Sequence, residues 1–124
     1  MKKIIATTNA PAAIGPYSQA TEANGMIFIS GQLPINPTTG EMPETIKEQT
    51  RQALENTKAI LESQGLTMKN IVKATVLLKS IEDFGAMNEV YASYFTEEPP
   101  ARAAYEVANL PKAALVEIES IAAR

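Results

Sequence analysis

The chain has 124 residues, a net charge of −3, and neither cysteine nor histidine. Its length fits one domain with a hydrophobic core of its own. The absence of cysteine excludes disulfides and thiolate chemistry, and the absence of histidine removes the usual triad base and the commonest transition-metal ligand. A mildly acidic chain with no basic run argues against binding to nucleic acid or to an anionic membrane.

Targeting signals are not apparent. The apolar run after Lys2 and Lys3 is too short for a secretory signal, and no stretch approaches the ~20 apolar residues of a membrane span. We therefore expect one domain over residues 1–124, located in the cytoplasm.

The N-terminal part of the chain favours short strands. A strand is expected over residues 3–6, and two more are expected over 18–23 and 26–30. Between the last two lies Asn24-Gly25, a dipeptide that readily adopts positive φ and favours a two-residue hairpin turn. We therefore predict a β-hairpin here.

A proline-containing loop over residues 31–43 leads to the first helix. Thr45 is a typical N-cap, and Glu48 three residues later completes the pattern of a capping box. Apolar residues then follow the helical period up to Gly65, which is placed as a C-terminal glycine should be.

The second half of the chain predicts one more helix and three strands. The β-branched and apolar segment 71–78 indicates an interior strand, and Ser80 with a following acid is a second capping signal. The helix that follows carries an apolar stripe, which we interpret as core, and Pro99-Pro100 ends it. The stripe consists of Phe84, Met87, Tyr91, Tyr94 and Phe95. Strands are then expected over 102–108 and 115–122.

This order, β-β-β-α-β-α-β-β, is that of an α+β protein with a single sheet. Two helices can cover only one face of such a sheet. Yet the segments 26–29 and 71–78 are apolar on both of their faces. A second apolar face needs a partner, and a symmetric homo-oligomer is the common solution.

Arg102 is the first candidate for chemistry. It follows Pro99-Pro100-Ala101 and precedes two small residues, Ala103 and Ala104. On spacing alone, it is either a surface arginine paired with a nearby carboxylate or a fixed guanidinium that binds a ligand carboxylate in the space its neighbours leave.

Glu117 and Glu119 share one face of the last expected strand. Two acids on one face usually point to solvent. The alternative is that one of them faces a closed site, where desolvation raises its pKa and makes it a general acid or base.

The remaining polar positions have ordinary explanations. The segments 15–19 and 30–32 fit turn chemistry at strand ends, and Asn88 fits the surface of a helix. We find no nucleotide-binding loop, nucleophile elbow or metal-spaced acid cluster.

Taken together, several of these segments resemble the Rid family of reactive-intermediate deaminases, also called the YjgF family. They run in order along nearly the whole chain: Asn9 to Gln19, Ile29 to Pro34, Pro100 to Arg102, Val107 to Pro111, and Val116 to Glu119.

The resemblance implies a chorismate-mutase-like fold that assembles as a homotrimer, with the sheets as an inner barrel, the helices outside and the active sites in clefts between subunits. It implies hydrolysis of 2-imino acids, formed from enamines such as 2-aminoacrylate, to 2-oxo acids and ammonia. Pyridoxal-phosphate dehydratases would supply these substrates. No cofactor or metal is implied, and no nucleic-acid or membrane partner is expected.

The resemblance also implies roles for single residues. Arg102 would bind the substrate carboxylate, and Glu117 would activate the attacking water. The backbone carbonyl of Ala104, where many relatives have cysteine, would accept a hydrogen bond from the iminium nitrogen. The other pocket positions would be Tyr17, Ser30, Gly31 and Asn88.

Two alternatives remain. The cleft of a ligand-binding or regulatory trimer would use Arg102 to bind a 2-oxo acid without turnover. An RNA-directed role, as a ribonuclease or translation inhibitor, has been ascribed to some members of the family, but the net charge of −3 and the lack of histidine argue against it here.

Overall fold

The expected hairpin is present in the computed structural model, which describes residues 1–124. Strands β2 (Ala20–Ala23) and β3 (Met26–Gln32) pair antiparallel across a turn in which Asn24 has φ 52° and Gly25 has φ 77°. Positive φ at both central residues matches the twist of the two strands, so this turn sets the hairpin register.

The first helix begins and ends where the sequence indicates. Helix α1 spans Ile46–Glu62, and the Thr45 hydroxyl accepts a hydrogen bond of 3.2 Å from the backbone N–H of Glu48. The reciprocal bond of a capping box, from the Glu48 side chain back to Thr45, is not formed. Gly65, with φ 73°, turns the chain away from the helix end.

The segment after α1 contains the interior strand and the second helix. A 3-10 turn (η1, Met68–Asn70) leads into β4 (Ile71–Leu78), which has the predicted bounds. The Ser80 hydroxyl accepts from the N–H of Glu82 and so caps another 3-10 turn, η2 (Ile81–Asp83). Helix α2 (Phe84–Tyr94) therefore begins later than the capping signal at Ser80 indicates.

One sheet collects all six strands, in the order β1-β2-β3-β6-β4-β5. Strand β1 (Lys3–Ile5) forms one edge, and β5 (Ala101–Glu106) forms the other. Strand β6 (Val116–Ala123), reached through the turn η3 (Pro111–Ala113), lies between β3 and β4. Strand β5 lies at the edge beyond β4, and their pairing is the one parallel pair in the sheet.

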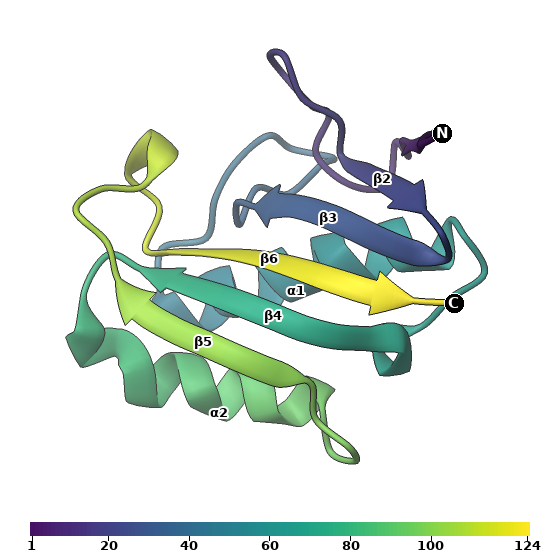
Figure 1. The fold of residues 1–124 in the computed structure, drawn as a ribbon. Coiled ribbons are helices and arrows are strands. Elements are labelled where there is room, and N and C mark those ends of the chain that lie inside the picture. Colours follow the sequence, from purple (N-terminus) through teal and green to yellow (C-terminus); the bar gives the residue numbers. More distant parts are fainter.

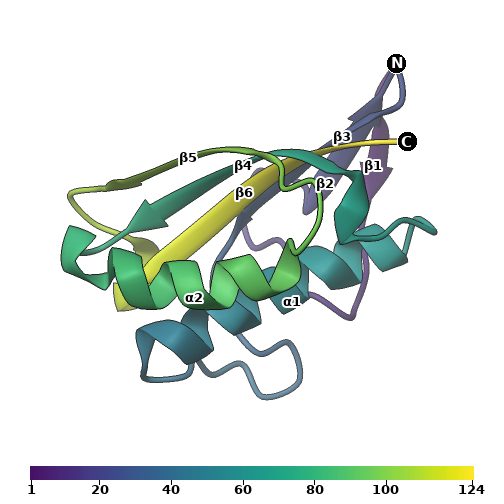
Figure 2. The same cartoon turned by 90° about the horizontal axis from the view of Figure 1, so that it is seen from below.

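Both helices lie on the same face of the sheet: they are behind it in Figure 1, and beneath it in Figure 2, where the molecule is turned by 90°. The core fills the space between these layers. Its largest fully buried residues include Ile27, Leu54 and Ile118. This arrangement confirms the α+β fold with two helices on one face. Neither α1 nor α2 combines the length and the apolar composition of a membrane-spanning helix.

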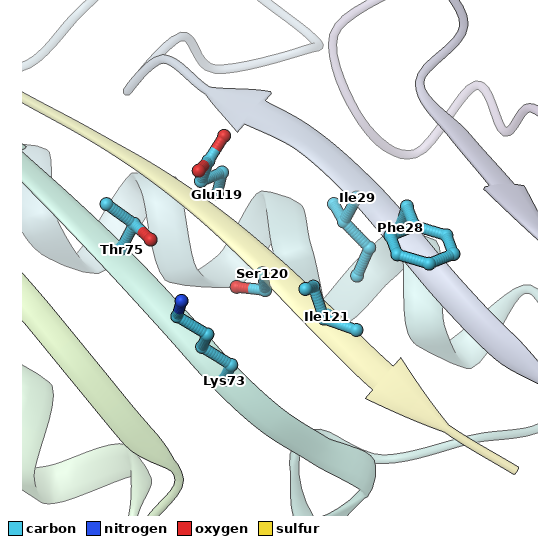
Figure 3. Close-up of a pocket in the computed structure, with 7 residues that line it drawn as sticks. All are labelled: Phe28, Ile29, Lys73, Thr75, Glu119, Ser120 and Ile121. Carbon is cyan, nitrogen blue, oxygen red and sulfur yellow. The ribbon is translucent and has the colours of Figure 1, made fainter.

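The opposite face of the sheet has no helix over it. Phe28 on β3 and Tyr105 on β5 leave 47% and 49% of their surfaces exposed there. In Figure 3, Lys73 and Thr75 on β4, Glu119 on β6 and Phe28 surround a shallow hollow in this open face. Phe28, which the sequence placed on a second apolar face, is thus uncovered within one copy of the chain. The prediction that the segment 71–78 is apolar on both faces is wrong at Lys73 and Thr75, which are polar and lie on the open face.

Candidate active site

Arg102 is held against helix α2. It is paired in register with Ala74, a buried core residue, so its side chain points to the helix side of the sheet. The guanidinium carbon lies 4.7 Å from the ring centre of Tyr91 and 5.4 Å from that of Phe84, within the range of cation–π attraction. Its Nη1 donates to Oδ1 of Asn88 at 2.6 Å. The remaining N–H groups have no protein partner and are available to a carboxylate.

The apolar stripe of α2 therefore has two roles. Met87 and Tyr91 are buried in the core as the sequence predicts, but Tyr91 also supports Arg102. A cleft of about 410 Å³ opens beside this pair. The cleft is lined by Asn88, Tyr91, Ala92, Phe95, Pro99, Pro100 and Arg102.

Ala104 offers its backbone to the same edge of the sheet. The N–H of Val107 donates to the carbonyl of Leu78 on β4 at 2.9 Å. Because backbone groups alternate along a strand, the N–H and C=O of Ala104 point away from β4. Its methyl group packs against the core. The carbonyl is thus on the free edge, as an acceptor for a ligand would have to be.

Glu117 lies on the open face of the sheet. It stands between Val116 and Ile118, which are both fully buried on the helix side, so alternation directs its own side chain the other way. Burial raises the pKa of the Glu117 carboxyl above its ordinary value, and the negative charge of Glu119 adds to this increase. A raised pKa moves this carboxyl toward the range in which a general acid or base is effective.

A larger cleft, of about 610 Å³, opens in front of Glu117. It is formed by the N-terminal loop, the end of β3, the turn η3 and β6. Its lining includes Tyr17, Ser30, Gly31, Lys112, Glu117 and Glu119. Tyr17 stands at the rim with 53% of its surface exposed.

Ser30 holds the wall of this cleft together. Its hydroxyl donates to the carbonyl of Ser18 at 2.6 Å, and its N–H donates to the carbonyl of Gln19 at 3.0 Å. These bonds join the loop that carries Tyr17 to the end of β3. The Ser30 hydroxyl proton is therefore engaged within the protein.

Gln19 has a role that sequence reasoning missed. Its buried amide accepts from the N–H of Thr7 at 2.7 Å and donates to the carbonyls of Thr7 and Pro11 at 3.0 and 2.7 Å. A buried amide whose donors and acceptor are all engaged fixes the N-terminal loop around the cleft. Gln19 lies at the end of the segment 15–19, which the sequence analysis interpreted only as a turn. A polar side chain next to an expected strand was the signal that could have indicated this role.

The structure separates the predicted residues into two groups. Arg102, Asn88 and Ala104 lie together on the helix side at the β5 edge. The other group, on the open face around the Glu117 cleft, consists of Tyr17, Ser30, Gly31 and Glu117. No group of three or more acidic side chains is placed to hold a metal ion.

These features define a class of small α+β protein with two clefts, one beside a guanidinium with free N–H groups and the other in front of a half-buried carboxyl. The family model described as Endoribonuclease L-PSP matches residues 7–124. The chain belongs to this family, which is the Rid or YjgF family that the sequence motifs indicate.

Individual relatives match over their whole length. A RutC family protein of Pyrococcus horikoshii is 58% identical and covers 98% of both chains. A 2-iminobutanoate/2-iminopropanoate deaminase of Escherichia coli is 52% identical, over 100% of this chain and 99% of its own. Among solved structures, a Rid family protein of Yersinia pestis has a TM-score of 0.97 at 50% identity, each chain covered completely. E. coli TdcF with bound serine has a TM-score of 0.95 at 46% identity, with 98% of each chain covered.

Proposed function

We propose that this protein is a 2-iminobutanoate/2-iminopropanoate deaminase, which hydrolyses reactive imines to 2-oxo acids and ammonia without a cofactor. The observation that carries the proposal is a pair of side chains: the Arg102 guanidinium, which makes one hydrogen bond within the chain and keeps its other N–H groups free, and the partly buried carboxyl of Glu117. An anchor for a carboxylate and a base for water are the two groups that this hydrolysis needs. The full-length similarity to the E. coli deaminase supports the same conclusion.

The substrate carboxylate would bind the free N–H groups of Arg102, and the carbonyl of Ala104 would accept a hydrogen bond from the iminium nitrogen. Glu117 removes a proton from water as the water oxygen bonds to the imine carbon, which gives a carbinolamine. The protonated Glu117 then donates to the amine nitrogen, the C–N bond breaks, and the alcohol proton passes to the released ammonia as the ketone forms, which leaves Glu117 ionised again. A protonated imine is already electrophilic, so positioning and proton transfer supply the acceleration.

The proposed function requires more than one copy of the chain, because a single copy does not bring Arg102 and Glu117 together. Arg102 faces the helices, whereas Glu117 faces the open side of the sheet. A small imino acid can meet both only where the β5 edge of one copy lies against the Glu117 cleft of another. We infer a homotrimer whose open sheet faces line an inner barrel, which would also cover Phe28 and Tyr105.

The chemistry of the substrate implies its source. Imines of this kind hydrolyse in water and must be produced nearby, and pyridoxal-phosphate dehydratases that act on serine or threonine release them. We place the protein in the cytoplasm beside such enzymes, with no nucleic-acid or membrane partner.

The test is a coupled assay in which a threonine dehydratase generates the imine and its disappearance is followed with and without this protein. We expect faster loss of the imine, abolished by Arg102→Ala and retained by Arg51→Ala, which removes an exposed guanidinium on α1. An uncatalysed rate with the assembled wild-type protein would contradict the proposal. If 2-oxobutanoate still binds in that case, the regulatory alternative holds.

A further inference from the structure

Strand β3 contains a bulge beside Glu117. In its pairing with β6, Ile29 is opposite Ser120 and Gln32 is opposite Ile118, so two residues of β3, Ser30 and Gly31, face one residue of β6. A bulge bends the strand and redirects the residues within it. Here it brings the backbone of Gly31 against the side chain of Glu117.

The carboxyl of Glu117 occupies the space where a side chain on residue 31 would be. A Cβ built on Gly31 would lie 2.9 Å from Cδ and 3.2 Å from Cγ of Glu117, and closer still to Oε2. The three atoms nearest to that Cβ all belong to Glu117. The backbone of Gly31 is not in the left-handed region, so the conformation alone does not require glycine.

We propose that Gly31 is a positioning residue for the reaction: its missing side chain reserves the place in which the Glu117 carboxyl is held toward the cleft. This inference rests on the proposed function. Gly31 acts through Glu117, whereas the family resemblance implied only that it lines the pocket.

The pKa of the Glu117 carboxyl depends on how deeply it is buried, so a change in its position can be measured as a change in its pKa. The titratable groups of the same copy that line this cleft are Tyr17, Lys112 and Glu119, and the proposed assembly adds Arg102 of a neighbouring copy. Burial is the main cause of the raised pKa of Glu117. A methyl group on residue 31 would push the carboxyl outward into water, and its pKa would then fall toward the ordinary value.

The experiment compares Gly31→Ala with Gly85→Ala. Gly85 also lacks positive φ, but a Cβ there would meet no atom within 4 Å, so it is a matched control. For Gly31→Ala we expect kcat to fall by roughly 10- to 100-fold, because small displacements of a reacting group are costly. Binding of 2-oxobutanoate should stay within about twofold, since the Arg102 anchor is unchanged. Gly85→Ala should retain full activity.

A double variant tests whether Gly31 acts through Glu117. In a Glu117→Gln background, adding Gly31→Ala should cause no further loss of kcat, because the group that the methyl displaces no longer acts as a base. An equal further loss would overturn the proposal, as would a Gly31→Ala enzyme with unchanged kcat. If Gly31→Ala alone does not fold, adding Glu117→Ala removes the atoms nearest to the methyl. Recovery of folding would then support the placement, and failure to recover would overturn it.

A carboxyl-carbon NMR titration of Glu117 separates this inference from the proposed function. If wild-type turnover is absent, the deaminase assignment fails, but the position of the carboxyl is still measured. A lower pKa of Glu117 in Gly31→Ala, with no change in Gly85→Ala, supports the positioning role. An unchanged titration in both variants overturns it.

Discussion

Glu117 and Glu119 occupy adjacent positions on the open face of β6, yet they differ in their surroundings. Glu117 is half-buried in the cleft, whereas Glu119 is exposed and also borders the hollow in Figure 3. The pKa is raised at Glu117, first by burial and then by the charge of Glu119. The sequence did not distinguish these two acids, because both lie on the same face of the strand. In the structure they differ in how far each side chain is buried.

Replacing the Glu117 carboxyl with an amide should remove catalysis while keeping the ligand anchor. For Glu117→Gln we expect kcat to fall by about 10²- to 10⁴-fold, the usual contribution of a general base. Binding of 2-oxobutanoate, measured by calorimetry, should be unchanged. Glu62→Gln, an exposed carboxyl at the end of α1, serves as the control. Retained turnover in Glu117→Gln would exclude Glu117 as the base.

The charge of Glu119 should affect the pH dependence of the reaction. In the proposed mechanism Glu117 acts as a base in its ionised form, so activity should fall as the pH drops through its raised pKa. Glu119→Gln removes a negative charge that raises this pKa, and the acid limb of kcat/KM should move to lower pH. Part of the increase remains, because burial persists. If the acid limb of kcat/KM lies at the same pH in the wild-type and Glu119→Gln enzymes, the charge of Glu119 has no influence on proton removal by Glu117.

At the scale of elements, α2 and β5 form one unit in which a core helix supports Arg102, the side chain proposed to bind the substrate carboxylate. The oxygen of Tyr91 is buried without a hydrogen-bond partner, while its ring lies under Arg102. The hydroxyl and the ring can therefore be tested separately.

Tyr91→Phe keeps the ring and removes the unpaired hydroxyl, so we expect unchanged ligand affinity and a gain of about 1 kcal/mol in the free energy of unfolding. Tyr91→Leu keeps much of the apolar volume and loses the cation–π contact, so affinity for 2-oxobutanoate should fall about two- to fivefold. Thermal unfolding and calorimetry measure the two effects. Equal affinities for the Phe and Leu variants would show that the ring does not support Arg102.

Local chemistry made most elements predictable. Asn24-Gly25 specified the hairpin, and Thr45 specified the start of α1, because each acts through bonds to its own neighbours. The β3 bulge and the delayed start of α2 were not predicted. The bulge exists only in the pairing of β3 with β6, a strand almost ninety residues later in the chain, so no nearby residue signals it.

The candidate site also combines features that local sequence indicates with features that depend on distant strands. Motifs indicated Arg102 and Glu117, but their placement on opposite faces depends on the register of β5 with β4 and of β6 with its two neighbours. Long-range pairing of this kind depends on contacts between distant segments. The sequence therefore indicated Arg102 and Glu117 as candidates, but not that they lie on opposite faces of the sheet within one copy.

At the scale of the whole molecule, the proposed sharing of one site between two copies predicts complementation. Arg102→Ala and Glu117→Gln should each be inactive alone. When the two are unfolded and refolded together in equal amounts, about a quarter of the interfaces in a closed ring receive an intact Arg102 and an intact Glu117 from neighbouring copies. Imine hydrolysis should then recover to about a quarter of the wild-type rate. No recovery from mixed oligomers would show that the two residues do not serve one site across copies.

The free edge of β5 also has a consequence for handling the protein. Its outward N–H and C=O groups, including those of Ala104, could pair with a strand from any other chain, which is how sheet proteins aggregate. Pro99 and Pro100 limit this edge at its start. A separated copy would still expose a six-residue template, Ala101–Glu106. Dilution followed by reconcentration should therefore promote precipitation, and a saturating 2-oxo acid should preserve the clear solution.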